Sequence, residues 1–281
     1  MEFIDAIIHH SFLQNALLAG LLASIACGVV GSFVVARRIT YLAGGLAHSV
    51  FGGLGVAHYL SVSCGWTWLQ PLHGAAVAAL LAAVVIGWVS LRAREREDTA
   101  IGAVWAVGMA VGIVFISRTP GYNQDLMSYL FGNILMVGTG DLWLIAILDV
   151  LILLVTFLFF NRLQAVCYDQ EFTRVRRVNV EFFYLLLLSV TALTVVILTT
   201  VVGIVMVIAM LTLPAAIALR FTRSLRQAML VAVLLSALFS TVGLGVSYTP
   251  DLPAGATIIL VAGVAYGLAA LWGRFRNTNR G

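Results

Sequence analysis

Apolar runs of about twenty residues recur along this chain of 281 residues, and no other feature restricts its fold as strongly. A helix of that length crosses the ~30 Å hydrocarbon core of a bilayer, whereas a membrane strand needs only about ten alternating residues. Charged residues make up 10% of the chain, far below the roughly 25% of soluble domains. The sequence therefore predicts an all-α integral membrane protein, a polytopic helical bundle that forms one transmembrane domain over residues 1–281.

Nine spans and one shorter segment account for the apolar runs. The expected spans are 13–36, 40–60, 71–91, 100–116, 141–160, 182–200, 203–219, 228–248 and 254–272. Residues 126–137 form an apolar stretch of only twelve positions, which is too short to span, so we expect a half-helix or re-entrant piece there. The joint at residues 200–203 leaves almost no loop between two spans and is the weakest point of this assignment.

Arginine clusters between the spans indicate their orientation. All 16 basic residues are arginines, and alternating the nine spans places fifteen of them on one side. The segments on that side are 37–38, 92–98, 161–180, 220–226 and 274–281. Because cytoplasmic loops are enriched in basic residues, we expect an outside N-terminus and a cytoplasmic C-terminus in a multi-pass protein of the cytoplasmic (inner) membrane.

The absence of lysine excludes one class of function. A P-loop ATPase needs the lysine of its Walker A motif, so any ATP hydrolysis must take place on another subunit. No HExxH or GxSxG motif supports an intramembrane enzyme. The three cysteines are scattered without metal-ligand spacing. The net charge of +4 comes from short clusters between spans, so no nucleic-acid partner is expected.

One ionisable residue is predicted at depth in the second span. His48 follows Arg37 and Arg38 by about ten residues, or ~15 Å along a helix, which is about half of the hydrocarbon core. Gly44, His48 and Gly52 share one helix face at spacings i, i+4 and i+8. An ionisable group on an open face favours a transport pathway. The alternative is a small-residue packing face whose histidine is hydrogen-bonded to a carbonyl.

Asp149 is a second candidate for the pathway. It lies near the middle of the fifth span, where an acid must face protein or water. It could ligate a passing ion or act as a protonated or hydrogen-bonded packing residue. The remaining histidines, at positions 9, 10, 58 and 73, are expected near the outer face, where they could form a mouth suited to Zn²⁺ or could be unrelated interfacial residues.

Four stretches of this chain resemble the membrane permeases of metal-ion ABC importers, which carry zinc, manganese or iron. They read RRITYLAGGLAHSVFGGLG, DLMSYLFGNIL, YDQEFTRVRRV and VVGIVMVIAMLTLPAAIALRFTRSLRQAML, and they occur in order between residues 37 and 230. The resemblance implies a homodimer, a separate cytoplasmic ATPase pair and a separate extracytoplasmic metal-binding protein. It implies a transported divalent metal rather than a permanently bound cofactor.

The last of these stretches predicts a coupling segment. Pro214 cannot donate a backbone hydrogen bond, so we expect it to bend or break the helix. Arg220 and Arg223 are spaced to share a helical face, and Arg226 follows. By resemblance, the segment from Pro214 to Arg226 docks on the ATPase. The alternative is that these arginines only anchor the helix at anionic headgroups.

The chain departs from the family pattern beside His48. Where these permeases usually carry an aspartate four residues before the histidine, this chain has Gly44. His48 is then the predicted metal ligand, with one imidazole per protomer or two across a dimer axis. Losing an oxygen ligand favours zinc over manganese. The alternatives are a permease for manganese, iron or a metal chelate, and an ATP-independent channel or secondary transporter.

Overall fold

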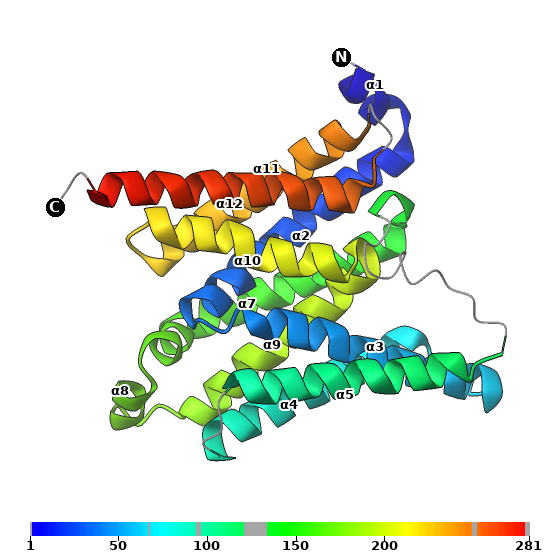
Figure 1. Cartoon of the computed structure of the whole chain (residues 1–281), viewed down its shortest axis with the longest axis horizontal. Coiled ribbons are helices and arrows are strands. Elements are labelled where there is room, and N and C mark those ends of the chain that lie inside the picture. Colours follow the sequence, from blue (N-terminus) through cyan, green and yellow to red (C-terminus); the bar gives the residue numbers. More distant parts are fainter. Residues whose placement is uncertain (1, 67, 94–96, 121–133, 249–251, 279–281) are drawn as a thin grey trace.

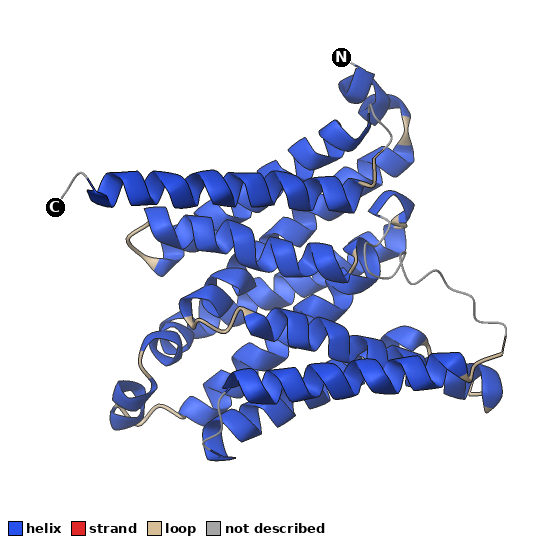
Figure 2. Cartoon of the chain, viewed as in Figure 1, coloured by secondary structure: helices blue, strands red, loops and turns tan. Residues whose placement is uncertain are grey.

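The computed structural model describes residues 2–66, 68–93, 97–120, 134–248 and 252–278, and this part of the chain is helical without strands (Figure 2). Its elements are α1 (Glu2–His9), α2 (Ser11–Ala36), α3 (Tyr41–Ser63), α4 (Pro71–Trp88), a short π-helix η1 (Val89–Ala93), α5 (Glu97–Ser117), a 3-10 turn η2 (Ile134–Met136), α7 (Thr139–Tyr168), α8 (Gln170–Val175), α9 (Val180–Val202), α10 (Ile204–Phe221), α11 (Leu225–Tyr248) and α12 (Ala254–Thr278). The all-α membrane fold predicted from the sequence is confirmed.

The nine predicted spans correspond to nine long helices in the described residues. Eight of them are long and apolar enough to cross a membrane. The ninth, α3, has 23 residues, but its five glycines and two histidines make it less apolar. Since 23 helical residues extend roughly 35 Å, α3 is also long enough to span.

Two groups of helices pack side by side in the bundle (Figure 1). In one group, α2 is buried among α7, α10 and α11. In the other, α3 lies between α4 and α5. Helix α9 joins the groups because it packs against both α4 and α7. Large apolar side chains on α4, α5 and α7 remain exposed, as expected for helices that face lipid or a partner.

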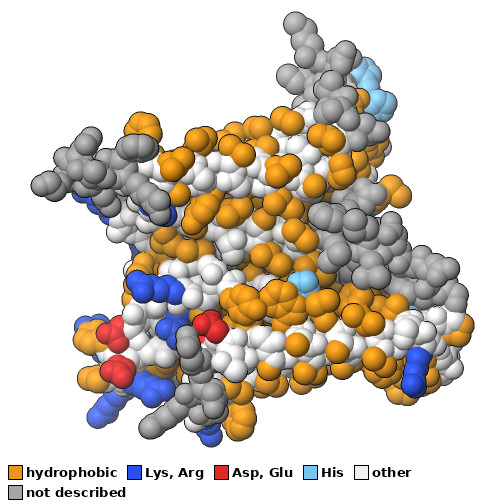
Figure 3. All heavy atoms as spheres, viewed as in Figure 1, with side chains coloured by type: hydrophobic (Ala, Val, Ile, Leu, Met, Phe, Trp, Pro, Cys, Tyr) orange, Lys and Arg blue, Asp and Glu red, His pale blue; other side chains and the backbone are white. Residues whose placement is uncertain are grey.

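Arginine side chains gather at one end of the bundle. Figure 3 shows them crowded around α8 and the neighbouring helix ends, while apolar side chains cover the spans. The two chain termini lie at opposite ends of the long helices (Figure 1). The predicted clustering of the arginines is therefore present in three dimensions.

A single glycine separates α9 from α10. Gly203 has φ 89°, a left-handed conformation that favours glycine, and the chain reverses direction there. The joint that looked weakest in the sequence is thus a real boundary between two helices. The predicted half-helix over residues 126–137 falls mostly outside the described residues. Of that segment the structure describes only residues 134–137, which include the 3-10 turn η2.

Candidate functional site

His48 makes its one ring contact within the described residues through the face of its imidazole. It is the eighth residue of α3, roughly 10 Å along the helix from Tyr41, and it is half-buried. Its imidazole stacks on the indole of Trp105 from α5, with ring centroids 4.5 Å apart and an interplanar angle of 7°. Neither ring nitrogen makes a hydrogen bond within the described part of the chain. The carbonyl partner that the packing alternative assigned to His48 is therefore not found among the described residues.

Trp105 is itself fixed by contacts along α3 and α5. Its indole N–H donates to the sulfur of Met109 at 3.2 Å, and its ring lies 5.4 Å from that of Tyr41. A Cβ atom at Gly44 would lie 3.7 Å from Trp105 Cζ3 and 3.9 Å from Ile208 Cδ1, both ordinary contacts. The indole and α10 thus border the space beside Gly44, and a small side chain would fit there.

Gly52 has a different environment from Gly44. A Cβ atom at Gly52 would lie only 2.6 Å from the carbonyl oxygen of Gly108 on α5. The two helices approach closely here because both positions lack side chains, as is common between membrane helices. The expected open space above His48 is therefore absent at Gly52, where the backbone of α5 fills it. A pathway role for Gly52 stays a prediction.

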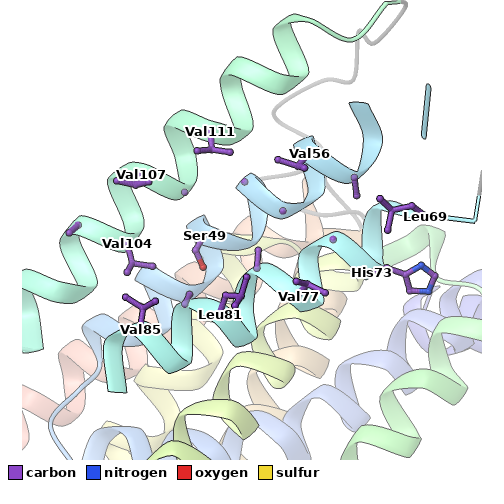
Figure 4. A pocket seen from close by; sticks show the side chains of 18 residues that line it. Ser49, Val56, Leu69, His73, Val77, Leu81, Val85, Val104, Val107 and Val111 are labelled. Atoms are coloured by element: carbon purple, nitrogen blue, oxygen red, sulfur yellow. The ribbon is translucent and has the colours of Figure 1, made fainter. Parts of the chain in front are cut away.

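An apolar groove of about 720 Å³ lies among α3, α4 and α5 (Figure 4). Of the side chains labelled in Figure 4, only Ser49 and His73 are polar. The Ser49 hydroxyl donates to the carbonyl of Leu46, so it is already engaged. The groove consequently offers few groups that could replace the hydration shell of a metal ion.

Asp149 does not join His48. It is 4% exposed on α7 and lies against Ala26 and Cys27 of α2. Both carboxyl oxygens are buried without a hydrogen bond of good geometry in the described residues. Helix α7 is not among the helices that pack on α3. The two predicted pathway residues of this chain therefore belong to separate helix contacts.

No group of three or more histidine, cysteine, aspartate or glutamate side chains is assembled for metal binding in the described residues. The four outer histidines accordingly do not form a cluster. One of them has a structural role, since His73 Nδ1 accepts a hydrogen bond from the Gln70 N–H at 3.3 Å at the start of α4. His48 remains the candidate ligand within the spans.

A polar network ties four elements together at the arginine-rich end. Arg37, at the end of α2, forms a 3.1 Å ion pair with Glu97 at the start of α5. The same Glu97 oxygen accepts hydrogen bonds from Ser90 at 2.7 Å and from Tyr184 at 3.1 Å. The guanidinium of Arg37 also lies 5.3 Å from the centre of the Tyr184 ring. These partly buried contacts fix α2, η1, α5 and α9 relative to one another.

Pro214 does not break its helix. It is buried inside α10, which continues to Phe221 before Thr222 turns to an extended conformation. Of the predicted bend or break, the break does not occur, and a bend at Pro214 stays a prediction. Neighbouring helices can support a proline within a membrane helix, because they constrain the chain around the missing hydrogen bond.

The three arginines of the predicted coupling segment have different surroundings, and two of them contact aromatic rings. Arg220, on α10, lies over the ring of Tyr266 at 5.9 Å. Arg226, on α11, lies over Phe160 at 4.7 Å. Arg223 lies in the short connection between these helices, so it does not share a helical face with Arg220 as predicted. It is exposed and makes no ion pair or ring contact with any described residue.

Sequence reasoning passed over Trp105, which makes the one ring contact of His48 in the described structure. A signal was available, because Trp105 lies eight residues inside α5. Membrane tryptophans concentrate at the two interfaces, so an indole within a span indicates a special contact.

Comparisons with known proteins match almost the whole chain. The profile of the ABC 3 transport family matches residues 9–273. The probable metal transport system membrane protein of Chlamydia muridarum is 40% identical over 264 residues, covering 94% of this chain and 90% of the relative. The manganese transport system membrane protein MntC of Halalkalibacterium halodurans is 34% identical over 268 residues, covering 95% and 89%.

A solved structure has the same architecture. A chain from PsaBC of Streptococcus pneumoniae in complex with a Fab matches with a TM-score of 0.82 and 31% identity. The match covers 95% of this chain and 94% of the other. The resemblance to the permeases of metal-ion ABC importers, first seen in four sequence stretches, is confirmed over the full bundle.

Proposed function

The chain belongs to the ABC 3 transport family, and from this we infer that it is the membrane permease of an ATP-driven importer of divalent metal ions, with zinc as the favoured cargo. The observation that carries this proposal is the half-buried imidazole of His48, which lies in a long membrane helix with both nitrogens unbound. Such a group can exchange water for a metal ion during passage. The ion is a transported substrate, so the permease needs no resident cofactor.

The choice of zinc rests on the ligands around His48. Imidazole suits zinc, whereas carboxylate and water oxygens suit manganese. Gly44 supplies no oxygen ligand one turn from His48. Manganese is the alternative cargo, since the relative from H. halodurans is named a manganese transport protein.

The proposed assembly contains partners on both faces of the membrane. Because the chain has no lysine and hence no Walker A motif, ATP is hydrolysed on separate cytoplasmic subunits. We place the arginine-rich end and the C-terminus in the cytoplasm of an inner membrane, by the positive-inside rule. A second copy of the chain completes the pathway, and an extracytoplasmic binding protein delivers the ion.

Coupling to the ATPase is assigned to the connection between α10 and α11. Arg223 is exposed there without a partner among the described residues, so it is free to contact another protein. Arg220 and Arg226 are held over aromatic rings of α12 and α7 and stiffen the two sides of the connection. Pro214 lies two turns further inside α10 and can act only through the helix.

The role of His48 is tested by zinc uptake. The complete importer is reconstituted in proteoliposomes, and ATP-driven uptake of ⁶⁵Zn is measured for the wild type and His48→Ala. We expect at least a ten-fold lower initial rate, with unchanged assembly. His10→Ala is the matched control, because His10 is exposed outside the spans and should leave uptake unchanged. Normal uptake by His48→Ala excludes this residue from the pathway.

A separate experiment distinguishes an importer from a channel. The permease is purified in mild detergent from cells that contain its partners, and bound proteins are identified. We expect a P-loop ATPase to co-purify and uptake to require ATP. Uptake that proceeds without any nucleotide-binding subunit supports an ATP-independent channel or secondary transporter and contradicts the importer.

A further inference from the structure

The orientation of His48 lacks the support that metal-binding histidines ordinarily have. Such a histidine almost always donates its second ring N–H to a carboxylate, a carbonyl or a water, and this contact fixes the ring. In the described residues His48 has no such partner. The contact that restrains its ring is the parallel stack on Trp105, at 4.5 Å and 7°.

We propose that Trp105 is the positioning residue of the metal pathway, and that its indole replaces the usual hydrogen-bonding partner of His48. This inference rests on the proposed function, because it assumes that His48 contacts the transported ion. Trp105 itself touches no ion. It acts by fixing the plane of the imidazole, so that a nitrogen at the ring edge is presented and the ring face is covered.

The indole of Trp105 is held firmly enough to fix the plane of the His48 imidazole. Its N–H is bound to Met109 one turn further along α5, and Tyr41 contacts its ring from the start of α3. The close approach of Gly52 to Gly108 fixes the distance between the two helices one turn beyond the stack. The indole therefore has a constant position relative to the backbone of His48.

A stacked indole, unlike a hydrogen bond, leaves the imidazole free to rotate by a half-turn that keeps its ring plane. A half-turn of the imidazole about its Cβ–Cγ bond exchanges the two edges of the ring but keeps the ring plane, so the stack is preserved. Either nitrogen can then face the ion. A hydrogen bond would select one nitrogen and one tautomer. The stack thus fixes the plane of the imidazole while either of its nitrogens can face the ion. This arrangement suits an ion that must be bound and released quickly.

The indole of Trp105 should also favour the state in which a metal ion is bound to His48. A metal-bound imidazole carries positive charge, and the face of tryptophan attracts cations more strongly than the other aromatic rings do. Contacts of this kind at half-exposed sites change an equilibrium about five-fold. At position 105, phenylalanine would retain a flat ring with a weaker attraction for the metal-bound imidazole, whereas leucine would retain only apolar volume.

The test is a double-mutant cycle in the reconstituted importer, with ⁶⁵Zn uptake at saturating ATP as the readout. We expect Trp105→Leu to lower the initial rate about five-fold and Trp105→Phe to stay within about two-fold of the wild type. In the His48→Ala background, Trp105→Leu should cause no further loss. Trp143→Leu is the control, because Trp143 is exposed on α7 away from the stack and should transport normally.

The outcomes separate this inference from the proposed function. An equal loss from Trp105→Leu with and without His48 shows that Trp105 does not act through the imidazole, and this overturns the inference while the importer stands. Wild-type proteoliposomes that fail to take up ⁶⁵Zn with ATP contradict the proposed function instead. Assembly with the ATPase is checked by size-exclusion chromatography. If Trp105→Leu does not assemble, Trp105→Met takes its place, since the flexible methionine chain adapts to an irregular space.

Discussion

Two glycines on one face of α3 should respond to the same substitution in opposite directions. Gly44 and Gly52 are buried two turns apart, so Ala at either position gains the same helix propensity, up to about 1 kcal/mol. At Gly44 the added methyl group meets Trp105 and Ile208 at ordinary distances of 3.7 and 3.9 Å. We therefore expect Gly44→Ala to be neutral or slightly stabilising.

At Gly52 the added methyl group meets the backbone of α5, which can move away only if the whole helix shifts. It would lie 2.6 Å from the Gly108 carbonyl oxygen, whereas an ordinary contact begins at 3.4 Å, so α3 and α5 must separate. Overpacking of this kind costs about 1–3 kcal/mol. Because the propensity gain is common to both variants, their difference in unfolding free energy isolates this steric cost, and Gly52→Ala should be the less stable by about 1–3 kcal/mol.

The difference is measured by unfolding both variants and the wild type in mixed micelles with increasing SDS, followed by circular dichroism. Uptake assays on the same preparations report whether each variant still assembles. Equal stabilities, or a more stable Gly52→Ala, would refute the view that Gly52 serves close packing of α3 on α5.

Three further changes test the other features of the bundle. Gly44→Asp places a carboxylate one turn from His48, and we expect tighter equilibrium binding of ⁵⁴Mn with slower ATP-driven uptake. Unchanged ⁵⁴Mn binding contradicts a metal site at this position. Asp149→Asn should keep ⁶⁵Zn uptake within about two-fold of the wild type, because Asp149 packs on α2. Loss of uptake with normal assembly would instead place Asp149 in the pathway. Glu97→Ala removes the acceptor of three contacts and should lower stability by about 1–3 kcal/mol in the SDS titration; no change would mean that the network contributes nothing measurable.

The spans could be predicted because a membrane helix needs a long apolar run and arginines mark its cytoplasmic end. Both signals are local in sequence. The arginine pattern identified α3 even though glycine and histidine lower its apolarity. It also supported a boundary near Gly203, where the sequence offers almost no loop and the structure shows a left-handed glycine. The fold class and the helix count were therefore accessible without coordinates.

The site could be predicted only in part, because its geometry depends on contacts between helices. His48 stood out as an ionisable residue in a span, but the stack on Trp105 joins α3 to α5 and leaves no spacing pattern. Asp149 lies in a helix that is apolar on nearly all sides, so the sequence could not show which face it occupies. The break predicted at Pro214 does not occur, because packing supports a proline that would disrupt an isolated helix.

The same contacts bear on where the importer selects its ion. On the proposed function, a metal ion beside His48 meets one imidazole of this chain, and no group of three or more metal-ligating side chains is assembled in the described residues. Most of the ion's ligands must then remain water, or come from the second copy of the chain that the proposed assembly contains. A site with so few protein ligands discriminates weakly among divalent ions but releases them readily, which conduction requires. We therefore expect the binding protein that delivers the ion to set selectivity, and the stack of His48 on Trp105 to set the rate of passage.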